Sequence, residues 1–186
     1  MDLPELAGAL VSPLATVLLA WAIGNRLSTH WANRQKRREE TRTAANEFYR
    51  LYGEFFAAWK LWNYSLKNAE DPERVARRWE LLKRAAAAEA GVEALLVKLT
   101  SERRFDEPDI EALGRFRQGF QTLRQTMRDA RKLDWGSSDH PEYAAFKRLA
   151  SHVGRLVSTV DQGKTPTISE AQQALISVTS NVWEPR

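Results

Sequence analysis

Residues 6–25 read LAGALVSPLATVLLAWAIGN, twenty positions without a formal charge. A helix rises by about 1.5 Å per residue, so this stretch spans roughly 30 Å, the thickness of a bilayer's hydrocarbon core. It predicts a single transmembrane helix close to the amino terminus. The mean hydropathy of the whole chain is −0.51, which confines the membrane-spanning part to this segment.

Three other interpretations of residues 6–25 compete with a transmembrane helix. A buried helix of a soluble domain seldom runs for twenty uncharged residues. The spacing of Ala20 and Ala22 resembles a signal-peptide cleavage site, but signal peptides begin with a basic segment, whereas Asp2 and Glu5 make this one acidic. A helix lying in the membrane interface would need a charged face, which this stretch lacks.

Charge differs on the two sides of the stretch. The preceding residues contain two acids and no lysine or arginine, while the following residues are basic as far as Glu39. Because lysines and arginines near a membrane stay in the cytoplasm, we expect the amino terminus outside and the remainder cytoplasmic, at a bacterial inner membrane. The membrane-surface basic cluster, expected to contact the lipid bilayer, comprises Arg26, Arg34, Lys36, Arg37 and Arg38.

Small side chains recur at every fourth position of the apolar stretch. In lipid, helices associate through close backbone approach and short hydrogen bonds, and small residues at four-residue spacing permit that approach. This small-residue row predicts self-association into a homo-oligomer through the transmembrane helix. Its members are Gly8, Ser12, Thr16, Ala20 and Gly24.

Beyond the stretch, apolar residues repeat at threes and fours, and no strand pattern occurs. The fold class predicted is all-α, with the transmembrane helix continuing to about Lys67 and a cytoplasmic antiparallel bundle of four to five helices. Further helices are expected from Pro72 to about Glu102, from Asp106–Pro108 onward, from Pro141 to Gly163, and from a Thr167–Glu170 capping box to about Asn181. The expected domains are an anchor at 1–25, a basic juxtamembrane helix at 26–44 and the bundle at 45–186.

One heptad seam on the first helix is almost wholly aromatic, which indicates the inner face of the bundle. On the second helix we expect Val75, Trp79, Leu82 and Ala86 to face inward. The cytoplasmic packing seam of the first helix consists of Phe48, Tyr52, Phe55, Trp59, Trp62 and Leu66.

Residues for catalysis are scarce. The chain has no cysteine and only three histidines, so we expect no metal, no cofactor and no enzymatic activity. Asp139 and His140 precede a proline, where helix capping explains both. Helical ribonucleases of the HEPN type carry an Arg and a His with four to six intervening residues, whereas Arg26–His30 and Arg148–His152 each have only three. Arginines recur beside acids, which favours ion-pair faces over a phosphate track, so nucleic acid is not an expected partner.

Three functions fit this layout. The first is an effector whose subunits associate and form a pore or otherwise perturb the inner membrane. The second is a tether that recruits a cytoplasmic protein or nucleic-acid partner through its bundle, and the third is a ligand-sensing bundle. The layout is similar to small membrane-anchored helical accessory proteins of bacterial antiviral systems, which implies a defence role; the resemblance rests on no motif and assigns no residue. The small-residue row favours the effector.

Overall fold

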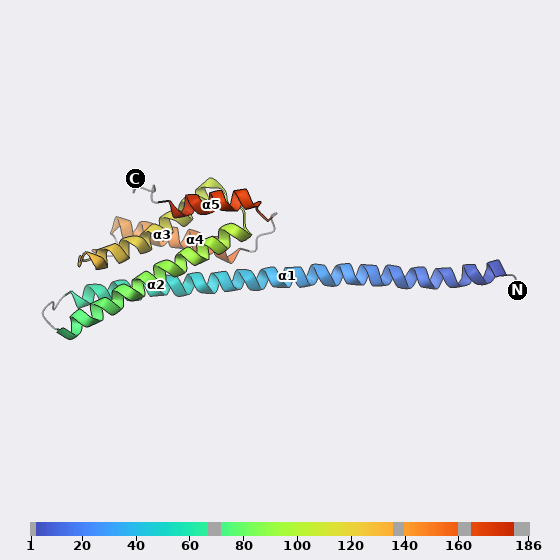
Figure 1. The fold of residues 1–186 in the computed structure, drawn as a ribbon, viewed down its shortest axis with the longest axis horizontal. Helices are drawn as coiled ribbons and strands as arrows, with labels where there is room; N and C mark the ends of the chain where they lie inside the picture. The colour runs from blue at the N-terminus through green and yellow to red at the C-terminus, as the bar shows by residue number, and fades with distance from the viewer. Residues whose placement is uncertain (1–2, 67–71, 136–139, 160–164, 181–186) are drawn as a thin grey trace. The chain divides into compact units, whose positions relative to one another are not determined.

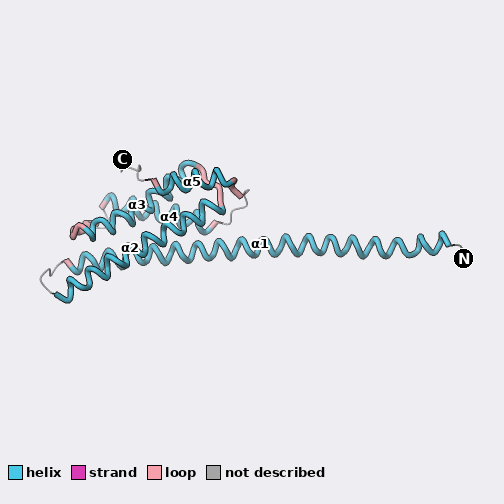
Figure 2. The backbone as a smooth tube through the Cα atoms, viewed as in Figure 1, coloured by secondary structure: helices cyan, strands magenta, loops and turns pink. Residues whose placement is uncertain are grey.

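The computed structural model describes residues 3–66, 72–135, 140–159 and 165–180, with side chains from Trp21 onward except at 22–24, 27 and 72–75. Every regular element in the described residues is a helix, and none is a strand (Figure 2). The predicted all-α class is therefore confirmed. In chain order (Figure 1) the helices are α1 (Leu3–Ser65), α2 (Pro72–Glu102), α3 (Glu107–Arg128), α4 (Pro141–Ser158) and α5 (Ile168–Thr179).

The chain divides into two compact units, Met1–Glu40 and Thr41–Arg186. Within the described residues, no helix combines the length and the apolar character needed to cross a bilayer. The predicted span at 6–25 falls inside α1, but only Trp21 and Asn25 of it have described side chains. The small-residue row, Gly8 to Gly24, accordingly lies outside the described side chains.

Local capping sets where α3 and α5 begin. The Asp106 carboxylate accepts a hydrogen bond from the backbone N–H of Asp109 at 3.0 Å, which satisfies a donor of the first turn. At α5, Thr167 and Glu170 form a reciprocal capping box, as predicted. Helix α2 begins at Pro72 and ends at Glu102, also as predicted. Helix α1 ends at Ser65, slightly before the expected Lys67, which is not among the described residues.

The second unit is a helical bundle around one aromatic core. Phe55 of α1 is fully buried and lies 5.0 Å from Phe120 of α3 and 4.5 Å from Phe146 of α4, between ring centroids. Helices α2 and α3 are antiparallel, because Glu89 pairs with Arg124 while Glu93 pairs with Arg117. Burial of such large rings is the main stabilising contribution to a domain of this size.

The predicted inward face of α2 is wrong at its first turns. Trp79 is 61% exposed and Ala86 is exposed, while Leu82 is half-buried against the core and the side chain of Val75 lies outside the described residues. The buried side chains of the later turns are Ala85, Ala88, Val92, Leu95, Leu96 and Leu99. Arg78 takes the inner position instead: its side chain is half-buried, and Nη2 donates to the backbone oxygen of Ser65 at 3.0 Å. An arginine can bury its methylene stem while its guanidinium binds carbonyls at a helix end. The inner face of α2 therefore includes a charged residue, Arg78.

Helix α4 stops at Ser158, earlier than the predicted end at Gly163, and residues 160–164 are not described. Thr159 has an extended backbone, and the buried Arg103 explains why the helix closes here. Its Nη1 donates to the backbone oxygens of Leu156 at 2.8 Å and Thr159 at 3.0 Å. The last carbonyls of a helix lack donors from the helix itself, and here a cation from the α2–α3 connection binds two carbonyls at the end of α4.

Candidate functional site

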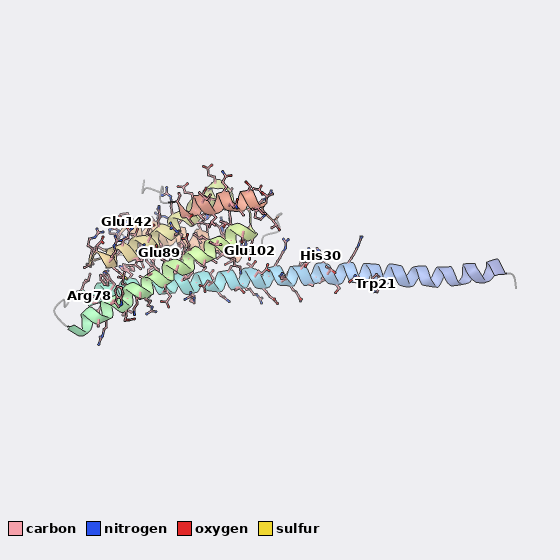
Figure 3. All side chains as sticks on the ribbon, in the orientation of Figure 1. Trp21, His30, Arg78, Glu89, Glu102 and Glu142 are labelled. Atoms are coloured by element: carbon pink, nitrogen blue, oxygen red, sulfur yellow. The ribbon has the colours of Figure 1, made fainter. Side chains whose placement is uncertain are left out.

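The part of α1 from Trp21 to Glu39, called here the basic segment, has no covered face within its own unit. From Trp21 to Glu39 every described side chain is exposed, including Trp21 at 68% and Trp31 at 62% (Figure 3). Helices in proteins depend mostly on packing of one face for their stability. The segment exposes two tryptophans together with several cations, a combination typical of surfaces that contact another molecule.

Five polar residues of this segment line a shallow hollow of about 310 Å³ on the surface of α1. The Thr29 hydroxyl donates to the backbone oxygen of Asn25 at 2.8 Å, so its proton is used inside the helix. The donors that remain directed outward belong to an arginine, a histidine and two amides. This polar hollow is lined by Asn25, Arg26, Thr29, His30 and Asn33.

No acidic residue occurs between Glu5 and Glu39. The amino-terminal part of the basic cluster therefore has no acid beside it in the sequence, and the pair Lys36–Glu40, 3.9 Å apart, lies at its far end. All five members of the cluster, Arg26, Arg34, Lys36, Arg37 and Arg38, are exposed. The arrangement concentrates positive charge on one stretch of helix, which attracts anions such as lipid phosphates.

Arginines of the bundle are used differently, because many of them pair with acids on a neighbouring helix. Arg84 of α2 lies 2.5 Å from Glu54 of α1, and Arg104 lies 2.8 Å from Glu170 of α5. The hydrogen bond from Arg84 lowers the pKa of the Glu54 carboxyl. These contacts form the ion-pair faces that the neighbouring acids predict, and they connect α2 to α1 and the α2–α3 connection to α5.

Residues of the packing seam lie inside the bundle. Phe48, Phe55, Trp59 and Trp62 are buried, while Tyr52 and Leu66 are half-buried. Burial raises the pKa of the Tyr52 phenol. The two indoles also donate hydrogen bonds, Trp59 to the backbone oxygen of Leu133 at 2.9 Å and Trp62 to that of Arg131 at 2.7 Å. The seam therefore holds the segment after α3 in place. Its side chains are part of the bundle's hydrophobic core.

The two histidines of the bundle, His140 and His152, have different surroundings. His152 Nε2 lies 2.9 Å from the Asp109 carboxylate, a contact between α4 and α3, and Arg148 is exposed one turn away. His140 is the N-cap residue of α4 but makes no capping hydrogen bond through its side chain, contrary to prediction. Imidazole is not a favoured cap, and Pro141 removes one of the donors. Asp139 lies outside the described residues.

Metal ligands are not grouped either: within the described residues, no three His, Asp or Glu side chains come together as a possible metal site. Comparison of the chain with known protein families, with curated proteins and with solved structures finds no match.

A second concavity lies within the bundle, between the last turns of α1 and the amino-terminal half of α2. It measures about 400 Å³, and its apolar lining comes from Leu61, Tyr64 and Leu81, with Arg77 and Arg84 at its edge. Leu61 is 46% exposed and Tyr64 63% exposed. Large exposed apolar side chains beside a concave surface are typical of sites where another molecule docks.

Several of these features escape a reading of the sequence. The inward role of Arg103, the contact between Asp109 and His152, and the hollow around His30 all depend on which side chains meet in three dimensions. For the hollow one signal exists: Arg26, His30, Asn33 and Arg37 follow one another at spacings of four, three and four, the spacing of a single helix face.

Proposed function

We propose that the protein is a single-pass membrane protein that self-associates and acts at the inner membrane as an oligomeric effector. The amino terminus is outside, the bundle is cytoplasmic, and the assembly forms a pore or perturbs the membrane. The observation that carries the proposal is the exposed, acid-free basic stretch of α1, which directly follows twenty uncharged residues. A bilayer supplies both environments that these two stretches require.

Self-association rests on the small-residue row. In an i, i+4 row each step turns by about 40° around the helix, so the row follows the inclined ridge along which right-handed helix pairs cross. Close approach along Gly8, Ser12 and Thr16 supports assembly inside the membrane, where helices gain nothing from burying apolar surface. The acidic amino terminus and the basic cluster fix one orientation for all subunits.

Exchange of the anchor tests the effector. Residues 1–25 are replaced by a poly-leucine helix, and the chain from Arg26 onward is kept. Growth arrest or depolarisation of expressing cells should be lost, because leucine favours insertion but blocks close approach of the helices. As the matched control, small residues are placed back at positions 8, 12, 16, 20 and 24 of the poly-leucine helix, and this variant should regain activity and subunit number in mild detergent.

Two measurements guard the interpretation of the exchange. A cytoplasmic reporter fused after Arg186 checks orientation, and circular dichroism checks that the bundle is folded. Activity that survives in the plain poly-leucine variant would show that any anchor suffices, and the effector would have to be abandoned in favour of the tether.

The tether is the second candidate, and one observation favours it. The concavity lined by Leu61, Tyr64 and Leu81 offers an apolar surface on the bundle that self-association through the anchor does not use. A tether holds a cytoplasmic protein partner at the membrane, and its bundle is the working part. In the anchor exchange it predicts full activity from both poly-leucine variants.

A further inference from the structure

We propose that the polar hollow on α1 binds the phosphate of an anionic phospholipid headgroup, with Arg26, His30 and Asn33 as its donors. The proposal rests on the proposed function only in placing α1 at a membrane surface. It goes beyond a general attraction between basic residues and lipids, because it assigns binding to one face of the helix.

The face follows from helix geometry. Successive residues turn by about 100°, so Arg26, His30, Asn33 and Arg37 fall within roughly 60° of one another around the axis. Arg38 and Trp31 lie about 120° to 140° from Arg26 on the same projection. The basic cluster is therefore spread around the helix, with Arg34 and Lys36 about 80° to either side of Arg26. Arg26 is the member of the cluster that lines the hollow, where a histidine and two asparagines lie beside it.

Arg26 has no carboxylate within reach along its own helix. The nearest acid in sequence is Glu39, thirteen positions later, which corresponds to about 20 Å of helix rise. A guanidinium that is exposed and far from any acid of its own helix is a good site for a phosphate, which it binds through two parallel hydrogen bonds. His30 and Asn33 provide further N–H donors for the remaining phosphate oxygens.

The position of the hollow selects a lipid as the source of that phosphate. Asn25 is the last residue of the predicted span, so the hollow begins where the hydrocarbon core ends. From Asn25 to Asn33 the helix rises about 12 Å, enough to pass through the roughly 5–8 Å headgroup layer of one leaflet. Lipid phosphates lie in this layer at high local concentration.

Native mass spectrometry of the full-length protein in mild detergent measures the binding. Phosphatidylglycerol is titrated against the wild type, Arg26→Gln and the charge-matched control Arg38→Gln, with phosphatidylcholine as the neutral lipid. Loss of one interfacial cation corresponds to roughly a fivefold change in affinity. We expect Arg26→Gln to weaken phosphatidylglycerol binding about fivefold, and Arg38→Gln to weaken it less than twofold.

Further variants and a competing ligand test which face of α1 binds the phosphate and whether that phosphate belongs to a lipid. An additional His30→Gln substitution should weaken binding further, while Arg26→Lys should restore part of it. Equal losses for Arg26→Gln and Arg38→Gln would mean a diffuse basic surface and would overturn the proposal. So would displacement of phosphatidylglycerol by glycerol phosphate at similar concentration, because the ligand would then be a free phosphate. Carbonate extraction of cell membranes separately tests whether the wild type is embedded, so failure of the proposed function is recognised on its own.

Discussion

Arginine has opposite uses in the two regions of this chain. In the bundle, Arg84 and Arg104 each pair with a glutamate of another segment, and the charge is neutralised internally. In residues 21–39 of α1, Arg26 has no acid within about 20 Å along the helix. The same residue type therefore joins helices in one region and presents uncompensated charge in the other. The difference teaches that counting cations is less informative than asking where their counter-ions are.

The largest effect should come from the core, where the bundle depends on its own packing. Phe55→Ala removes a fully buried ring that contacts Phe120 and Phe146, and should lower the free energy of unfolding by about 3–5 kcal/mol. Trp31→Ala, on the exposed segment, should change it by less than about 0.5 kcal/mol. Denaturant unfolding of the full-length protein, followed by circular dichroism, measures both. Similar losses for the two variants would erase the contrast between the regions.

A smaller effect distinguishes two adjacent arginines. Arg103→Ala should cost about 2–3 kcal/mol of unfolding free energy, because it leaves the carbonyls of Leu156 and Thr159 without a donor. Its neighbour Arg104 is exposed and forms only a surface ion pair, so Arg104→Ala should cost about 0–1 kcal/mol. The same unfolding assay compares them. If the order were reversed, the closure of α4 by Arg103 would not be a source of stability.

The smallest effect concerns an interhelical pair and depends on pH. The hydrogen bond from Arg84 lowers the pKa of Glu54 in the folded protein, so folding favours the ionised carboxyl. Its contribution is therefore present above the ordinary glutamate pKa of 4.5 and is lost as the pH falls through the lower folded value. At pH 7, Glu54→Gln should cost less than about 1 kcal/mol, since Arg84 is partly exposed.

Unfolding midpoints of the wild type and Glu54→Gln, measured from pH 7 to about pH 3, should converge toward the acid end. A difference that stayed constant over this range would mean that the substitution acts through packing and not through the charge of Glu54.

Features that depend on residues close together in the sequence were predictable, and features that depend on contacts between helices were not. The starts of α3 and α5 were predictable because Asp106 and the Thr167–Glu170 box bind backbone groups only three residues away. The inward face of α2 was not, because Arg78 is held inside by the Ser65 carbonyl of another helix. A hydrophobic tryptophan, Trp79, then appeared to belong to the core although it is exposed.

The candidate site shows the same limit in another form. The basic cluster is visible as composition, because it is a run of like charges beside an apolar stretch. The hollow depends on which residues share one face of the helix α1. It includes His30 and Asn33, which a count of cations omits. The concavity near Leu61 is lined by residues of two helices, α1 and α2, and no local sequence pattern shows which of their residues come together.

The side chain of Arg103 has a mechanical consequence as well. Besides closing α4, its Nη2 lies 3.3 Å from the Thr41 hydroxyl, at the residue where α1 enters the bundle unit. A pull along α1 would reach the bundle first at Thr41. Because the guanidinium also holds Leu156 and Thr159, this load would be shared at once by α1, the α2–α3 connection and the end of α4. Arg103 thus connects α1, at the residue where it enters the bundle unit, to the α2–α3 connection and to the end of α4.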